Sequence, residues 1–127
     1  YLALYPSHRL AKNNLPGEIL ELQKEPLIVN EPDIGLGVLI QRFLKKSGIV
    51  PLVVATSDNI HSSLMLVKSG LGVTLIPSIS GQAVALFKGV ILNPTKSQFE
   101  LPIVSVHREG SNSKMDNSNY ARLYQLF

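Results

Sequence analysis

Residues 64–78 read LMLVKSGLGVTLIPS, and this stretch decides the fold. It begins with apolar residues at helical spacing and passes through two glycines, Gly70 and Gly72, into an apolar run that ends at Pro77. A helix that stops at a glycine and leads almost at once into a short apolar strand is typical of a βαβ unit. The stretch therefore predicts an α/β fold built on a parallel sheet.

The same alternation of strand and helix extends toward the N-terminus. Short apolar runs bounded by proline or polar residues predict strands at 1–4, 26–29, 52–55 and 73–76. The runs at 26–29 and 52–55 are apolar at every position, which is the pattern of strands covered on both faces. We therefore expect both to be buried.

Two helices are expected between these strands. The first runs from Asp33, its N-cap, to Gly48, and its core stripe comprises Leu36, Leu39, Ile40, Phe43 and Leu44. The second is capped by Ser57 and Asp58, closes at Gly70, and buries Ile60, Ser63, Leu64 and Val67. With right-handed crossovers these units form one doubly wound, Rossmann-like layer.

The remaining segments are less regular. The polar run SHRLAKNN at 7–14 is interpreted as a loop, and a short helix at 15–23 places Leu15, Ile19 and Leu22 on one face. Further elements are expected as a helix at 80–87, strands at 90–92 and 101–106, and a helix at 120–127. Polar connections at 94–100 and 110–119 separate them.

Composition limits the class of protein. The 127 residues suit one domain, and 45% hydrophobic with 17% charged residues is typical of a globular chain. The net charge of +3 is scattered, with Lys45-Lys46 the only adjacent basic pair, so no DNA-binding patch is indicated. No membrane-spanning run, signal-peptide pattern or cysteine is present in the sequence, and we expect a cytoplasmic protein.

No pattern in the sequence indicates catalysis. The histidines His8, His61 and His107 have no metal-ligand spacing, and each is interpreted as a surface or loop residue. The acidic residues Glu18, Glu21 and Glu25 have the spacing of a solvated helix face. Because no nucleophile, phosphate-loop or dinucleotide motif occurs either, we expect no enzyme activity, no cofactor and no metal.

A ligand site is instead expected from the architecture. In open α/β sheets ligands lie beyond the carboxyl ends of the strands, where helix N-termini present free N–H groups. Here these ends are residues 30–34, 56–59 and 77–80, and all three segments carry small polar residues. The candidate contacts are Asn30, Glu31, Pro32, Asp33, Ile34, Thr56, Ser57, Pro77 and Ser78. Asp33, Ser57 and Asp58 could also serve only as helix caps.

The segment Val67-Lys68-Ser69-Gly70-Leu71-Gly72-Val73, followed by Ile76-Pro77-Ser78, resembles the effector-binding domain of LysR-type transcriptional regulators. That family has a helix ending in Gly-Leu-Gly-Val and an apolar strand running into Ile-Pro or Leu-Pro at this place. Residues 8–11, His-Arg-Leu-Ala, are similar to the family's His-Pro-Leu-Ala, with Arg9 in place of proline. Residues 101–108 are similar to the second crossing strand, and 120–127 to the final helix.

The resemblance implies a type 2 periplasmic-binding-protein fold, in which two lobes joined by crossing strands hold a small-molecule effector in their cleft. Residues 7–93 would then form the complete second lobe. Residues 1–6 and 94–127 would supply crossing strands and the C-terminal part of the first lobe. The family's loop after the second lobe's first long strand contacts the effector, which maps to residues 30–34.

The resemblance also implies partners. In the family the helix expected here at 34–47 pairs with another subunit, and a second apolar stripe on it, Ile34 and Val38, would form the contact in a homodimer or tetramer. DNA would be bound only by a domain absent from this chain. No membrane partner is expected.

Two other classes remain open at this stage. A solute-binding protein of a transporter shares the fold, and an enzyme on this scaffold would need catalytic groups that the polar loops do not supply. The two carboxylates Glu31 and Asp33 disfavour an anion in their loop, so we expect a neutral, polar or cationic effector.

Overall fold

The computed structural model describes residues 1–12, 18–33, 35–78 and 87–96. Within them, one five-stranded sheet has the order β3-β2-β4-β1-β5. The strands are β1 (Leu2–Leu4), β2 (Pro26–Asn30), β3 (Leu52–Ser57), β4 (Val73–Leu75) and β5 (Ile91–Asn93). The helices are α1 (Gly35–Lys46) and α2 (Ile60–Lys68), with 3-10 helices η1 (Arg9–Ala11) and η2 (Ile19–Lys24).

The sheet is mixed. β2 runs parallel to both β3 and β4, as the βαβ pattern predicts. β1 lies between β4 and β5 and is antiparallel to both, with Leu2 opposite Leu75 on one side and Asn93 on the other. A strand from the start of the chain therefore occupies the interior of the sheet.

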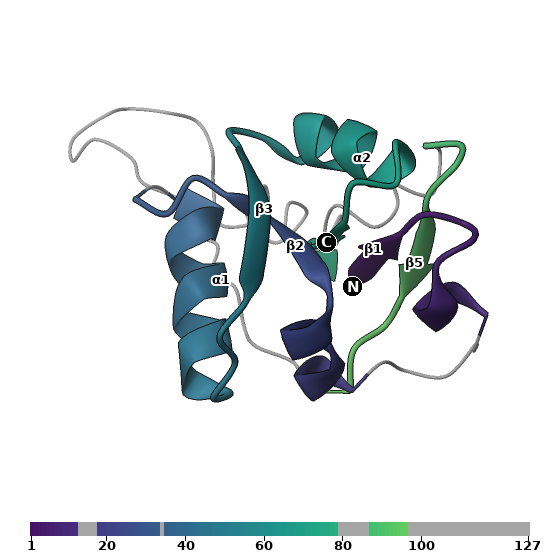
Figure 1. The fold of residues 1–127 in the computed structure, drawn as a ribbon. Coiled ribbons are helices and arrows are strands. Elements are labelled where there is room, and N and C mark those ends of the chain that lie inside the picture. The colour runs from purple at the N-terminus through teal and green to yellow at the C-terminus, as the bar shows by residue number, and fades with distance from the viewer. Residues whose placement is uncertain (13–17, 34, 79–86, 97–127) are drawn as a thin grey trace, which may run out of the picture.

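The two α-helices cover opposite faces of this sheet (Figure 1), as expected for a doubly wound layer. On the α1 face, buried side chains from the sheet, α1, η1 and η2 form the main core. On the α2 face a smaller core joins Ala3, Leu64 and Ile76, with Phe87 packed against it. The predicted core positions Ile40, Leu44, Leu64 and Val67 are all buried.

Two glycines are required by close backbone approaches. A Cβ on Gly37 would lie 1.8 Å from the carbonyl oxygen of Glu31, so α1 packs directly on the loop that follows β2. A Cβ on Gly72 would lie 2.5 Å from the carbonyl oxygen of Pro26, where β4 enters the sheet beside β2. Only glycine fits at these two positions without a backbone shift.

The expectation that the strand at 52–55 is buried is wrong. Leu52, Val53 and Val54 are 57%, 47% and 41% exposed. The reason is position, because β3 is the edge of the described sheet and has only β2 beside it. A register shift between Leu27 and Ile28 also displaces β3 against its neighbour.

Other expectations differ in detail. The run at 7–14 is not all loop, because η1 forms within it and the His8 side chain accepts a hydrogen bond from the Leu10 N–H. The helix expected at 15–23 is the 3-10 helix η2 in its described part, with Ile19 and Leu22 buried as predicted. α1 begins at Gly35, two residues after the predicted N-cap Asp33. The elements expected at 101–106 and 120–127 lie outside the described residues, as do Leu15, Ile34 and all of the helix expected at 80–87 except Phe87.

Candidate functional site

The carboxyl ends of β2 and β3 meet at one edge of the sheet, as the sequence predicts. Asn30 lies opposite Ser57 in the parallel ladder. The pairing continues one residue further, because the Glu31 N–H donates to the Ser57 carbonyl at 3.0 Å. β4 lies on the other side of β2 and leads into Pro77 and Ser78 at the same edge. The structure thus brings most of the predicted contact residues together.

Ser57 is held by the protein itself. Its buried hydroxyl donates to the Asn59 carbonyl at 2.8 Å and lies 2.7 Å from the Ser63 hydroxyl on α2. Ser57 and Asp58 were expected to cap α2, but the cap is Asn59, whose Oδ1 accepts from the Ser62 N–H at 2.8 Å. The expectation fails because β3 continues through Ser57, and the first free capping position comes two residues later.

Asn30 is the buried polar side chain that remains open at this edge. The residue is only 7% exposed, and its side-chain amide has no hydrogen bond with any other described residue. No fully enclosed side-chain nitrogen or oxygen in the described part of the chain lacks a partner, so the Asn30 amide retains an opening to the outside. An amide in this position has a donor and an acceptor available for a ligand.

The other predicted contacts lie at the surface of the edge. Glu31, Asp33, Thr56 and Ser78 are exposed, and Pro32 and Pro77 are half-buried. Ile34 lies outside the described residues. The exposed side chains are accessible to a ligand in a cleft. A solvent-exposed carboxylate or hydroxyl is not sufficient by itself to select a particular ligand.

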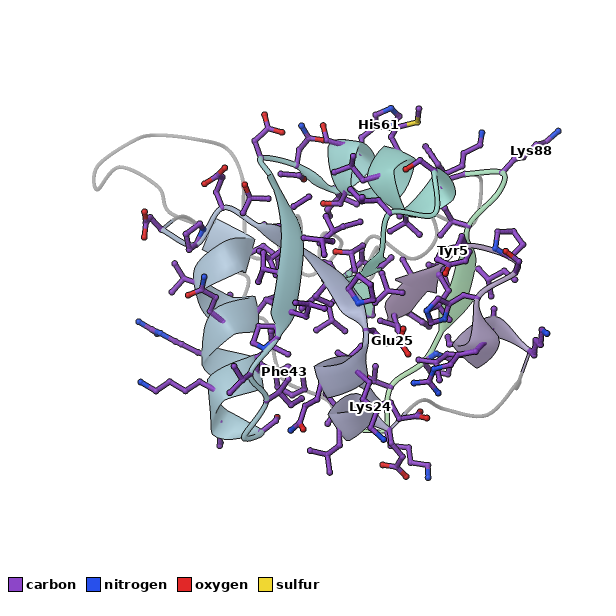
Figure 2. All side chains as sticks on the ribbon, in the orientation of Figure 1. Tyr5, Lys24, Glu25, Phe43, His61 and Lys88 are labelled. Atoms are coloured by element: carbon purple, nitrogen blue, oxygen red, sulfur yellow. The ribbon has the colours of Figure 1, made fainter. Side chains whose placement is uncertain are left out.

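A buried ionic cluster lies at the opposite, amino end of β2, where sequence reasoning missed it. His8 Nε2 lies 2.9 Å from Glu25 Oε2, and Arg9 Nε lies 2.6 Å from Glu25 Oε1. His8 and Glu25 are 4% and 6% exposed, so treating them as surface residues is wrong. Figure 2 shows Glu25 in the interior and Lys24 at the lower rim of the molecule.

This cluster has a structural role. Because His8 Nδ1 accepts from the Leu10 N–H, the proton of the neutral ring resides on Nε2, which donates to Glu25. The contact joins η1 to the residue that follows η2, across 17 positions of sequence. No local pattern signals such a contact, since it depends on how two loops meet in space.

A groove of about 460 Å³ lies between α1 and the exposed strand β3. Its walls include Val38 of α1 and Val53 of β3, with Arg42 and Lys45 also among the lining residues. Pro32, from the predicted ligand loop, lines this groove as well. The groove is therefore continuous with the loop after β2, while Asn30 pairs with Ser57 on the α2 side of the sheet.

Neither a metal-binding cluster nor a membrane-spanning helix is present in the described residues. They contain no group of three or more histidine, cysteine or acidic side chains placed to hold a metal ion. None of their helices has both the length and the apolar character needed to cross a membrane.

The sequence matches the family model described as the LysR substrate binding domain over residues 1–115. The chain belongs to this family. The α/β lobe described above is accordingly part of a type 2 periplasmic-binding-protein-like fold. The match also favours the regulator over a solute-binding protein, the alternative that sequence reasoning left open. No curated protein sequence matched the chain.

Solved LysR-family structures share the fold. The effector-binding domain of QuiR, in complex with shikimate, superposes with a TM-score of 0.67 at 19% identity over 78% of this chain. The BenM domain with its effector benzoate gives 0.65 at 22% identity over 76%. Full-length BenM gives 0.66 at 17% identity over 98%. This chain spans only 46%, 44% and 41% of those three chains, which is less than half of each.

Proposed function

We propose that this chain is part of the effector-binding domain of a LysR-type transcriptional regulator, which senses a small molecule in a cleft between two lobes. Residues 7–93 form the second lobe, and residues 1–6 are a crossing strand whose β1 completes the sheet of that lobe between β4 and β5. Residues 94–127 belong to the other crossing strand and the C-terminal part of the first lobe. DNA is bound by a separate domain outside this chain. The family match over residues 1–115 carries the proposal.

The proposed effector contacts are the loop after β2 and the ends of β3 and β4. They comprise Asn30 to Ile34, Thr56, Ser57, Pro77 and Ser78, of which Asn30 has the strongest structural support because its buried amide is open. Shikimate and benzoate, named with QuiR and BenM, are small ring compounds, and a molecule of similar size is proposed here. We further propose that the protein is cytoplasmic and catalyses no reaction.

A reporter assay with the full-length regulator tests this function. Its promoter region is fused to a reporter gene, and small molecules are screened for a change in output. An active compound should lose its effect in the Asn30→Ala variant and keep it in Met65→Ala, since Met65 is half-exposed on α2. Transcription that responds to no compound and no deletion of the regulator would contradict the proposal.

We also propose a subunit contact through Val38 of α1 and through Ile34, which precedes this helix in the sequence. The support is the groove between α1 and β3, which Val38 lines together with the exposed edge strand. Val50, Leu52, Val53 and Val54 leave that edge apolar and between 41% and 83% exposed. Uncovered apolar edges favour association, so a second subunit here would bury a surface that is otherwise a liability.

Light scattering on the complete effector-binding domain tests the contact. Val38→Glu should weaken the dimer by at least about tenfold, because a buried unpaired carboxylate opposes association. Met65→Glu places the same charge on α2, at a residue outside the groove, and should leave the dimer intact. Equal behaviour of the two variants would refute the proposed surface.

A further inference from the structure

The carboxyl edge of the sheet is uniformly acidic. Residues 30–33, 56–59 and 76–78 contain Glu31, Asp33 and Asp58 and no lysine, arginine or histidine. All three carboxylates are exposed. The chain as a whole has 12 basic and 9 acidic residues, so this edge is opposite in sign to the average of the molecule.

Two of the main-chain donors that could compensate these charges for an anion are already in use. The Glu31 N–H donates to the Ser57 carbonyl, which ends the β2–β3 ladder. At the N-terminus of α2, the Ser62 N–H donates to Asn59 Oδ1, and Asn59 Nδ2 donates to Asp58 Oδ1 at 2.7 Å. A helix N-terminus attracts anions when it is free. Here it has its own cap and an adjacent carboxylate.

Asn30 points to what the edge can bind. It pairs with Ser57, whose hydroxyl contacts α2, so the Asn30 side chain lies on the α2 side of the sheet. Ser57 is already satisfied by Asn59 and Ser63. The Asn30 amide is therefore the largely buried group at this edge with unused hydrogen-bonding capacity. A ligand hydroxyl, amide or ammonium group can satisfy it without adding negative charge.

We propose that this half of the cleft takes a neutral or cationic, hydrogen-bonding group of the effector, and that it excludes a carboxylate. Asn30 binds that group directly, and Glu31, Asp33 and Asp58 set the sign of the potential around it. This rests on the proposed effector-binding function and specifies which end of the effector this lobe receives.

Three probes that share one ring and differ in charge test the inference: benzamidine as the cation, benzamide as the neutral compound and benzoate as the anion. Their dissociation constants for the full-length regulator are measured by ligand-observed NMR at millimolar concentration. We expect benzoate to bind at least about tenfold more weakly than the other two at this site. Glu31→Gln should weaken benzamidine by about three- to fivefold.

Glu18→Gln is the matched control, because Glu18 is an exposed carboxylate that precedes η2, on the amino side of β2, and it should leave all three constants unchanged. Asn30→Ala should remove the binding of benzamide. Benzoate binding that is as strong as that of benzamide and sensitive to Asn30→Ala would overturn the inference. So would the failure of all three probes to depend on Asn30 or Glu31.

The reporter assay separates this inference from the proposed function. If the regulator responds to a carboxylate compound and Asn30→Ala abolishes the binding of that carboxylate, the effector-sensing function stands. The proposed charge preference is then overturned. Transcription that responds neither to any compound nor to deletion of the regulator would remove the function itself.

Discussion

Alanine at position 37 should destabilise the domain even though alanine forms helices better than glycine. Gly37 lies in the first turn of α1, where the helix rests on the carbonyl oxygen of Glu31. A Cβ would meet that oxygen at 1.8 Å, whereas real Cβ contacts stay above 3.0 Å, so helix and loop must separate by about 1.2 Å. The obstacle is backbone, which cannot turn aside as a side chain can.

Two opposing effects set the size of the change. Overpacking costs about 1–3 kcal/mol, and a backbone clash of this depth belongs at the upper end. Helix propensity returns about 1 kcal/mol when alanine replaces glycine inside a helix. A net loss of about 2 kcal/mol in the free energy of unfolding follows. With a urea m-value of about 2 kcal/mol/M, the midpoint should fall by about 1 M.

Urea unfolding of the complete effector-binding domain measures this shift. Gly35→Ala is a useful comparison, because Gly35 has φ +51° and open space where a Cβ would lie. Its cost comes from left-handed backbone alone, about 1–2 kcal/mol. Effector binding should distinguish Gly37→Ala from Gly35→Ala, because only Gly37→Ala displaces the loop that contains Asn30 and Glu31. A midpoint for Gly37→Ala that is unchanged or higher than wild type would refute the close packing of α1 on this loop.

Three further substitutions have expected stability changes that urea unfolding of the same domain can measure. Glu25→Ala should lower the free energy of unfolding by about 2–3 kcal/mol, because it leaves a buried histidine donor unpaired. Glu21→Ala should lower it by less than about 0.5 kcal/mol, because the ion pair of Glu21 is largely exposed. Similar losses for the two variants would mean that the buried pair is not formed. Asn59→Ala should cost about 1 kcal/mol through loss of the α2 cap, and no loss would show that another residue caps the helix. Leu64→Ala should cost about 2–5 kcal/mol and Met65→Ala under about 0.5, since the first is 3% and the second 50% exposed; the reverse order would place the wrong face of α2 inward.

Strongly periodic elements could be predicted from the sequence. The stripe that includes Ile40 and Leu44 fixes which face of α1 is buried, and Gly70, with φ +82°, ends α2 as expected. Strand burial was harder, because an all-apolar strand such as β3 has the same sequence pattern at an edge as in the centre. Its exposure follows from the strand order, which is a property of the whole sheet.

The expected architecture predicts that the candidate residues lie at one edge of the sheet, but it does not predict which of them cap a helix and which remain available to a ligand. Ser57, Asp58 and Asn59 are all good capping residues, and only the extent of β3 decides among them. The Ser57 hydroxyl has a hydrogen-bond partner because the Ser63 hydroxyl lies beside it, whereas the Asn30 amide has none among the described residues. The sequence does not show where the Ser63 hydroxyl lies. The contact between His8 and Glu25 depends on two distant loops meeting. Each of these features is set by tertiary structure, which local spacing does not encode.

The position of β1 has a consequence for the order in which the chain can fold during synthesis. Leu2 pairs with Leu75, so the first strand waits for 73 further residues before its partner exists. At ribosomal rates this takes roughly 4 to 15 s, far longer than local helices need to form. During that interval Leu2 and Leu4, both buried in the finished lobe, have no sheet to enter. The nascent chain therefore emerges with β1 unplaced, and this interior strand has both of its partners in the sheet only after β4 and β5 have left the ribosome.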